Sequence, residues 1–299
     1  MKVTSELAEA LAAGRPAVAL ESTLICHGIP KPENADLARE MEQRVRAEGA
    51  VPATMAVMNG AVRVGLAEDE LQTLATADDV AKCTTRDLPL ILARGGLGAT
   101  TVASTIYLAA KHGIGVMATG GLGGVHLGGE RSLDISADLY ELQRSPVAVV
   151  SAGVKSILDQ ARTMEMLESL GIPVIGYRCR ELPAFYTAES GIEIAGVDDL
   201  DQLTRVVGNH SSLGLPSGMF IVTPPPTAYA LSADETARLV DAAREAAERK
   251  NVLAAAQTPF MLRHMAEASE GRTVTLNIHL ATANATLAAK LAARLAEQA

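Results

Sequence analysis

The order of apolar and polar residues along the chain predicts strands and helices in alternation. Short runs rich in Ala and Val, such as residues 16–23 and 146–153, are typical of buried strands. Longer stretches with apolar residues every three or four positions, such as 33–49 and 136–145, predict helices. This alternation indicates an α/β protein with a three-layer α/β/α architecture around a central, mainly parallel sheet.

Turn residues refine this picture. Asn59-Gly60 separates two apolar runs, which is a strong signal for a β-hairpin and makes the expected sheet mixed. Further predicted helices are residues 67–77, 100–113 and 155–171, and further predicted strands are 114–121, 172–177 and 218–223. A strand followed by a turn is expected over 82–89, a helix after residue 198, and three helices after the last strand. Helix ends are expected at Gly49, Gly113 and Gly171. Since no linker or repeat divides the chain, we expect one domain over residues 1–299.

Composition narrows the class of partner. The chain has 299 residues, of which 48% are hydrophobic and 20% charged, as in soluble globular proteins. Its formal net charge of −9, and its content of three Phe, five Tyr and no Trp, argue against binding to nucleic-acid polymers or anionic membranes. A small phosphorylated ligand remains compatible, because a few local cations can override the overall charge.

The cysteines and the apolar segments indicate a cytoplasmic location. The three cysteines are far apart and form no metal-binding pattern, which is typical of a reducing compartment. The first residues predict a short amphipathic helix in place of a secretory signal. An uncharged stretch at 211–233 contains Pro216 and the run 224–226, so we expect no membrane-spanning helix.

Two residues at predicted strand ends could carry chemistry, because ligands of open α/β sheets bind beyond the carboxyl ends of the strands. Glu21 ends a buried strand, so it is either a general acid or the partner of a buried cation. Lys155 follows an apolar strand. Burial would favour its neutral amine, a nucleophile for carbonyl-like carbon, unless the side chain reaches solvent or pairs with a carboxylate.

A glycine-rich loop lies between these two residues. Six glycines between positions 120 and 129 could bring backbone N–H groups close to an anion, or could make a mobile surface loop. The loop lacks the dinucleotide-binding motif, and residues 153–156 lack the full spacing of a P-loop. His126, beside the glycines, either donates to a phosphate or makes a structural hydrogen bond.

Two acidic residues and one lysine complete the candidates. Asp134 and Asp138 flank the start of a predicted helix, where they could jointly hold Mg²⁺ or Mn²⁺ or simply favour the helix N-terminus. Lys82 follows an acidic stretch and is either a ligand-binding or a surface residue.

Taken together, the ordered motifs resemble a known family. The segments that carry the resemblance are VALESTLICHGIPKPEN, GAVPATMAVMNG, TTRDLP, GATTVAST, ATGGLGGVH, DISADL, SAGVKSILD and IPVIGY. In this order and spacing they closely resemble the pseudouridine-5′-phosphate glycosidases, a family that also contains the indigoidine synthase A proteins. The resemblance extends over residues 15 to 290; the segments that depart from it are residues 94–97 and 187–218.

The resemblance implies a reaction and a set of site residues. Enzymes of this family reversibly cleave the C–C glycosidic bond of pseudouridine 5′-phosphate to uracil and ribose 5-phosphate, with Mn²⁺, as homotrimers. The resemblance implies that Lys155 is the nucleophile, Glu21 the proton donor and Asp134 a metal ligand. The residues expected to contact the substrate are Lys82, Val102, Ser136, Ala137 and Asp138, with Thr119, His126 and Asn284 expected at the phosphate.

The chemistry of the bond explains the need for an amine. Carbon C5 of uracil cannot leave as an alkoxide or amide, so the ribose must open and its anomeric carbon must gain imine character. Two alternatives remain: another Schiff-base lyase or glycosidase for phosphosugars, or a non-catalytic phosphosugar-binding protein. The presence of both Lys155 and Glu21 favours an enzyme.

Overall fold

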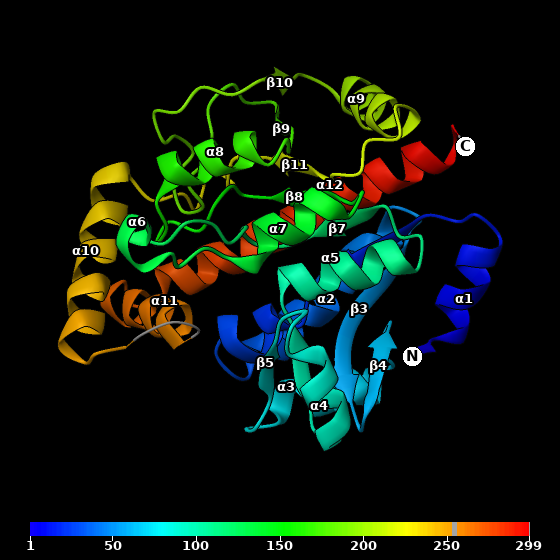
Figure 1. The fold of residues 1–299 in the computed structure, drawn as a ribbon, viewed down its shortest axis with the longest axis horizontal. Helices are drawn as coiled ribbons and strands as arrows, with labels where there is room; N and C mark the ends of the chain where they lie inside the picture. The colour runs from blue at the N-terminus through cyan, green and yellow to red at the C-terminus, as the bar shows by residue number, and fades with distance from the viewer. Residues whose placement is uncertain (253–255, 299) are drawn as a thin grey trace.

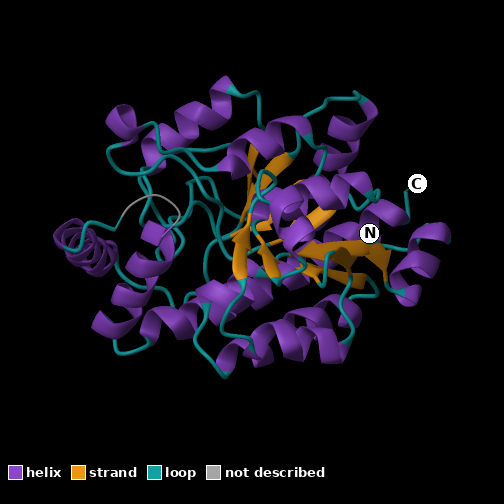
Figure 2. Ribbon diagram, turned by 60° about the horizontal axis from the view of Figure 1, so that its bottom comes forward, coloured by secondary structure: helices purple, strands orange, loops and turns teal. Residues whose placement is uncertain are grey.

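A twisted sheet runs through the molecule, with helices against both of its faces (Figures 1 and 2). The structure is a computed structural model, and it describes residues 1–252 and 256–298. The strands are β1 (Lys2–Val3), β2 (Ala17–Leu20), β3 (Val51–Met58), β4 (Ala61–Val64), β5 (Ala81–Cys83), β6 (Gly98–Thr100), β7 (Val116–Ala118), β8 (Ala148–Ser151), β9 (Val174–Tyr177), β10 (Gly196–Val197) and β11 (Met219–Val222). Their order is β1-β4-β3-β2-β7-β8-β11-β9-β10, with β6 pairing β3 and β5.

The sheet is mixed and mainly parallel, as predicted. Only the pairs β3–β4 and β3–β6 are antiparallel among the described strands. The central strands β2, β7, β8 and β11 are buried along their whole length, which explains why their sequences are continuous apolar runs.

Two layers of helices cover the sheet. The helices are α1 (Ser5–Ala12), the π-helix η1 (Leu24–Gly28), α2 (Glu33–Ala47), α3 (Glu68–Thr76), α4 (Leu88–Arg94), α5 (Val102–Lys111), α6 (Gly129–Ser132), α7 (Ala137–Arg144), α8 (Gln160–Ser169), α9 (Leu200–Ser212), α10 (Ala233–Arg249), α11 (Gln257–Ala268) and α12 (Arg272–Ala296). Helices α2 and α12 pack together behind the sheet in Figure 1, and α5 and α7 pack together in front of it.

The turn signals of the sequence are confirmed. Asn59 and Gly60 both have positive φ angles, 51° and 72°, and join β3 to β4 in an antiparallel hairpin. Gly49, Gly113 and Gly171 also have positive φ angles and follow the ends of α2, α5 and α8.

Two predicted helices begin later than expected. The helix predicted from residue 155 begins at Gln160, where the side chain of Asp159 accepts a hydrogen bond from the backbone of Arg162 (3.0 Å). The helix predicted from residue 100 begins at Val102, because residues 98–100 pair with β3 and β5 as strand β6. Lys155 therefore lies on a loop rather than at a helix start.

Short elements were missed in the sequence. These are β1, η1, β6, β10, α4 and α6, each of seven residues or fewer. Such segments are too short for a hydrophobic period to emerge. Within the described residues, no helix has the length and apolar character needed to cross a membrane.

Candidate active site

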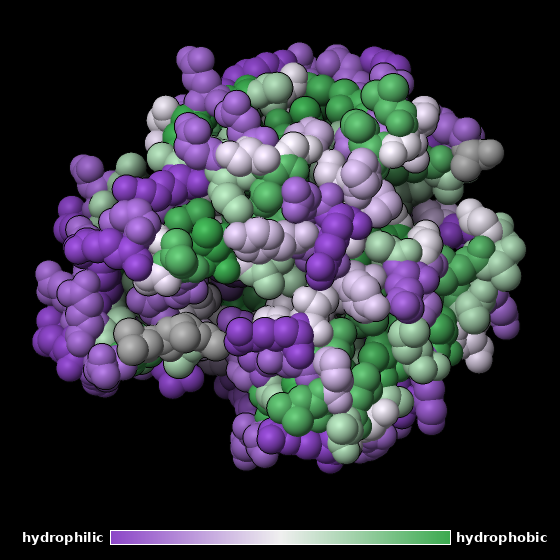
Figure 3. All heavy atoms as spheres, viewed as in Figure 1, coloured by the Kyte–Doolittle hydropathy of each residue, from purple (hydrophilic) through white to green (hydrophobic). Residues whose placement is uncertain are grey.

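A cavity of about 360 Å³ lies beyond the carboxyl ends of the central strands. Glu21 follows β2, Thr119 follows β7 and Lys155 lies just beyond β8, so three neighbouring strands bring these side chains to one place. The surface in Figure 3 is hollowed between α11 and the middle of the molecule. The cavity is lined by all but one of the predicted site residues, namely Glu21, Lys82, Val102, Thr119, His126, Asp134, Ser136, Ala137, Asp138 and Lys155.

Glu21 is a buried carboxyl group in the cavity wall. Only 7% of the residue is exposed, and the hydroxyl of Thr119 donates a hydrogen bond to its carboxylate. Burial raises the pKa of Glu21, against the opposing attraction of Lys155 and the hydrogen bond from Thr119. A carboxyl group that retains its proton to higher pH is suited to act as a general acid.

Lys155 lies on a loop whose position is fixed by backbone hydrogen bonds. Its N–H donates to the carbonyl of Leu122 (3.0 Å), and the N–H of Leu122 donates to the carbonyl of Gly153 (3.0 Å). These bonds join the lysine loop to the glycine loop. The side chain is partly buried and lines the same cavity as Glu21.

The glycine loop is packed into the protein, which corrects the alternative of a mobile surface loop. Residues 120–125 are all buried. A Cβ atom on Gly123 would lie 2.6 Å from Oδ2 of Asp138, and one on Gly124 would lie 2.6 Å from Cγ2 of Thr163. Glycine is needed here because the side chains of α7 and α8 occupy the space that a Cβ atom would fill.

The backbone of this loop is only partly used in contacts within the protein. The N–H groups of Leu122, Gly123, Val125, His126 and Gly129 donate to protein acceptors. Gly120 and Gly121 line the cavity, and among the described residues their N–H groups have no acceptor, so these two groups could bind an anion there.

Asp138 is held in the fold by two backbone hydrogen bonds. Its Oδ1 accepts a hydrogen bond from the N–H of Ala103 and its Oδ2 accepts one from the N–H of Gly123, both at 2.9 Å. Asp138 thus joins α5, α7 and the glycine loop. Asp134 is a partly exposed carboxylate whose Oδ2 lies 4.0 Å from Nδ1 of His126.

Lys82 and His126 supply basic groups to the cavity. Burial, followed by the nearby charge of Lys155, lowers the pKa of Lys82. Burial also lowers the pKa of His126, against the attraction of Asp134. Lys82 is therefore part of the cavity wall, which overturns the alternative that it is a surface residue.

Asn284 is the one predicted residue that does not line the cavity. It is 1% exposed, and its amide donates to the carbonyls of Thr119 (2.8 Å) and Gly120 (3.4 Å). The structure thus gives Asn284 a contact that holds the glycine loop, in place of the expected contact with the phosphate.

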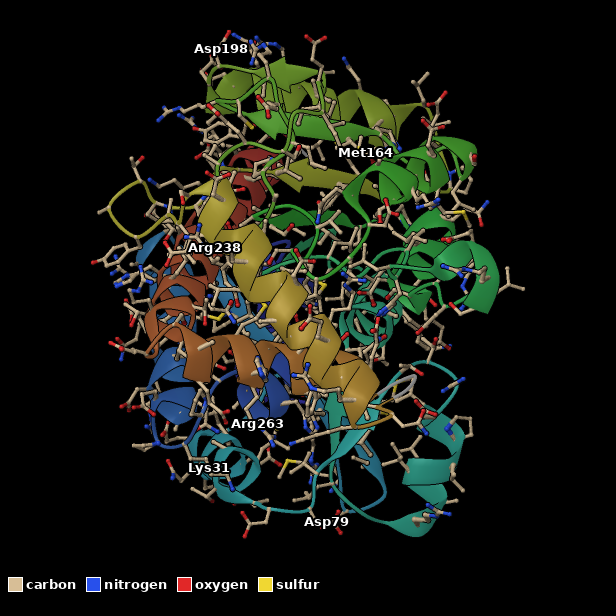
Figure 4. The ribbon with its side chains drawn as sticks, turned by 90° about the vertical axis from the view of Figure 1, so that its left-hand side faces the viewer. Lys31, Asp79, Met164, Asp198, Arg238 and Arg263 are labelled. Carbon is tan, nitrogen blue, oxygen red and sulfur yellow. The ribbon has the colours of Figure 1, made fainter. Side chains whose placement is uncertain are left out.

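Several residues of the cavity wall were missed in the sequence. Asn277 is 3% exposed, lines the cavity and leaves its side-chain oxygen without a hydrogen-bond partner in the described chain. It lies two turns before Asn284 on α12, and two buried amides seven residues apart in an Ala-rich helix were the available signal. The wall also includes Arg86 and Phe185, and Thr258, Pro259 and Leu262 of α11. Figure 4 shows α11, with Arg263, crossing α10, with Arg238.

The cavity could hold a divalent cation that keeps part of its water shell. The described residues contain no group of three or more His, Cys, Asp or Glu side chains able to hold a metal ion. Mg²⁺ and similar ions nevertheless bind through one or two carboxylates while they retain several waters. Asp134 is a carboxylate of this kind, with free access to water at the cavity wall.

Known proteins resemble this chain over nearly its whole length. The family model described as "Indigoidine synthase A like protein" matches residues 6–294. A pseudouridine-5′-phosphate glycosidase of Jannaschia sp. (strain CCS1) is 48% identical over 97% of this chain and 96% of its own length. One from Alkaliphilus metalliredigens (strain QYMF) is 45% identical over 99% of this chain and 96% of its own length.

Solved structures share the fold. The prealnumycin C-glycosynthase AlnA, crystallised in complex with ribulose 5-phosphate, superimposes with a TM-score of 0.91 at 36% identity, covering 99% of this chain and 97% of its own. An indigoidine synthase A-like protein from Thermotoga maritima gives a TM-score of 0.87 at 34% identity, covering 95% and 94% of the two chains. The match over residues 6–294, together with relatives that are 45–48% identical over nearly their whole length, shows that this chain belongs to the indigoidine synthase A-like family.

Proposed function

We propose that this chain is an enzyme that reversibly cleaves the C–C glycosidic bond of pseudouridine 5′-phosphate, giving uracil and ribose 5-phosphate. The observation that carries the proposal is the presence of Lys155 and the buried carboxyl of Glu21 in one cavity. The cavity volume of about 360 Å³ lies within the range of small-molecule sites. The names of the relatives from Jannaschia and Alkaliphilus support the same substrate.

The first part of the reaction opens the sugar. Glu21 gives its proton to the ring oxygen as the bond between that oxygen and C1′ breaks, and the amine of Lys155 adds to C1′. The fold supports this assignment because burial leaves Glu21 protonated to higher pH than an exposed glutamate.

The second part breaks the C–C bond. The nitrogen of Lys155, once bonded to C1′, loses a proton to Glu21, and Glu21 passes a proton to uracil C5. Uracil leaves with the electron pair of the C1′–C5 bond, while the nitrogen lone pair of Lys155 forms an iminium at C1′. Water then hydrolyses the iminium to ribose 5-phosphate and free lysine. The net change adds one water and transfers no electrons to or from the enzyme.

The phosphate is expected at the basic side of the cavity. Lys82 is a partly buried cation in the cavity wall and is our candidate to bind it, and His126 lines the same cavity. The N–H groups of Gly120 and Gly121, which line the cavity and have no acceptor among the described residues, would add to the binding of the dianion. Binding of the remote phosphate would help to position C1′ against Lys155.

A divalent cation, Mn²⁺ in this proposal, would be held by Asp134. When bound, it would polarise oxygens of the substrate. We assign Asp138 to holding the loops together, because both of its carboxylate oxygens accept backbone hydrogen bonds.

The decisive test is release of uracil from pseudouridine 5′-phosphate, measured beside uridine 5′-phosphate. We expect uracil only from the first compound; release from the second alone would indicate an N-glycosidase. Borohydride reduction in the presence of ribose 5-phosphate should add a ribose-phosphate mass to Lys155. Binding of ribose 5-phosphate without turnover of any substrate would indicate a non-catalytic binding protein.

We also propose a homotrimer in the cytoplasm, as the family resemblance implies. Light scattering coupled to gel filtration should give about three times the chain mass of 31.1 kDa. A mass of one or two chains would contradict the trimer.

A further inference from the structure

Phe185 combines an unfavourable backbone conformation with a place in the cavity wall. Its φ angle is 67°, in the left-handed region, where a bulky side chain is a genuine outlier. The residue is only 1% exposed. Such conformations cost free energy and persist only where the surrounding structure enforces them, which is common at functional sites.

The surrounding structure holds Phe185 against the loop that carries Lys155. The N–H of Phe185 donates to the carbonyl of Ala152 (3.0 Å), and Ala184 forms an antiparallel bridge with Gly153. Gly153 itself has a φ angle of 92°, and a Cβ atom there would collide with the carbonyl oxygen of Pro183. The two loops are therefore in backbone contact within two or three residues of Lys155.

The ring of Phe185 and the stem of Lys155 share the space above Gly121. A Cβ atom on Gly121 would lie 2.6 Å from Cδ2 of Phe185 and 3.2 Å from Cγ of Lys155. Both side chains thus crowd the same point of the glycine loop. With the ring in place, the stem of the lysine has fewer positions open to it.

We propose that Phe185 is a positioning residue that holds the Lys155 side chain in the orientation needed for attack on the sugar. The inference rests on the proposed role of Lys155 as the reacting amine. Glycine in place of phenylalanine would relieve the backbone strain but would leave a space beside the lysine stem. The left-handed backbone conformation of Phe185 places its ring where it restricts the movement of the Lys155 side chain.

The competing explanation is that Phe185 only fills the core. Both explanations expect a loss of stability when the ring is removed. They differ in kinetics: a positioning residue affects the chemical step, so kcat falls while KM, set largely by the phosphate, changes little. A misplacement of about 1 Å can cost about 100-fold in rate.

The experiment compares Phe185→Leu, Phe185→Ala and Phe185→Gly with Phe220→Leu, a matched change in a fully buried residue of β11 outside the cavity. Thermal unfolding, kcat and KM for uracil release, and the rate of borohydride trapping with ribose 5-phosphate are measured for each. We expect kcat and the trapping rate to fall about 10- to 100-fold in the Phe185 variants, with KM within about threefold. Phe220→Leu should lose stability alone.

A folded Phe185→Gly or Phe185→Leu variant with wild-type kcat and trapping rate would overturn the proposal. If the Ala and Gly variants do not fold, the Leu variant decides by the same criteria. If the wild-type protein releases no uracil, the proposed function fails, and the trapping rate with ribose 5-phosphate becomes the readout. Slower trapping in Phe185→Leu than in Phe220→Leu then supports positioning, whereas equal or absent trapping overturns it.

Discussion

Replacing Asp138 tests whether this carboxylate holds the site together or binds a metal. Each of its two oxygens accepts a backbone hydrogen bond at 2.9 Å, and the residue is 6% exposed. A hydrogen bond to a charged group contributes about 1.5–3 kcal/mol, so Asp138→Ala should lower the free energy of unfolding by about 3–6 kcal/mol. Asp138→Asn, which keeps one acceptor oxygen, should lose about half of that amount.

The assay is thermal unfolding at pH 7, with and without Mn²⁺. Unfolding entropy of about 2.1 cal/mol/K per residue converts the expected loss in Asp138→Ala to a fall in Tm of about 5–10 °C. Asp134→Asn is the matched control, since it changes the same residue type at a partly exposed position and should leave Tm within about 1 °C. The reasoning would be refuted if Asp138→Ala unfolded like the wild type and lost only its affinity for Mn²⁺.

Three further predictions concern the chemistry. Glu21→Gln should lower uracil release at least about 100-fold, the lower end of what general acid–base catalysis contributes. Because burial raises the folded-state pKa of Glu21, the stability of the wild type should fall as pH rises above the ordinary range of a glutamate, and Glu21→Gln should remove this dependence. Identical pH dependence of stability in both proteins would contradict the assignment. Lys82→Met should raise KM for pseudouridine 5′-phosphate about 10- to 100-fold, as expected for a lost charge-assisted hydrogen bond, without affecting pseudouridine itself; an equal effect on both compounds would place Lys82 away from the phosphate. Asp134→Asn should abolish the stimulation by Mn²⁺ that chelation and add-back reveal in the wild type, and a wild-type activity indifferent to chelator would make Asp134 structural.

The catalytic candidates were visible in the sequence because they follow strands. Glu21 and Lys155 stand at the ends of apolar runs, and the parallel sheet brings such ends together without further information. The fold class was predictable for the same reason: the central strands are buried throughout, so their composition alone distinguishes them from the amphipathic helices.

What the sequence could not show depends on partners that are distant along the chain. The hydrogen-bond partners of Asp138 and Asn284 are backbone groups of α5 and of residues 119–123, and residue identity does not reveal contacts made by backbone groups. The same holds for the glycine loop. The number of glycines suggests a flexible backbone, but in the structure Gly123 and Gly124 are needed because the loop packs closely against α7 and α8.

Thr119 also has a consequence for how this protein folds. Its hydroxyl binds Glu21, which lies 98 residues earlier, and its carbonyl binds Asn284, which lies 165 residues later. Closing such long loops is slow compared with forming helices, because chain entropy must be lost before the contact forms. During refolding we therefore expect helical content to return before enzymatic activity, with the site completed only when α12 docks behind the sheet.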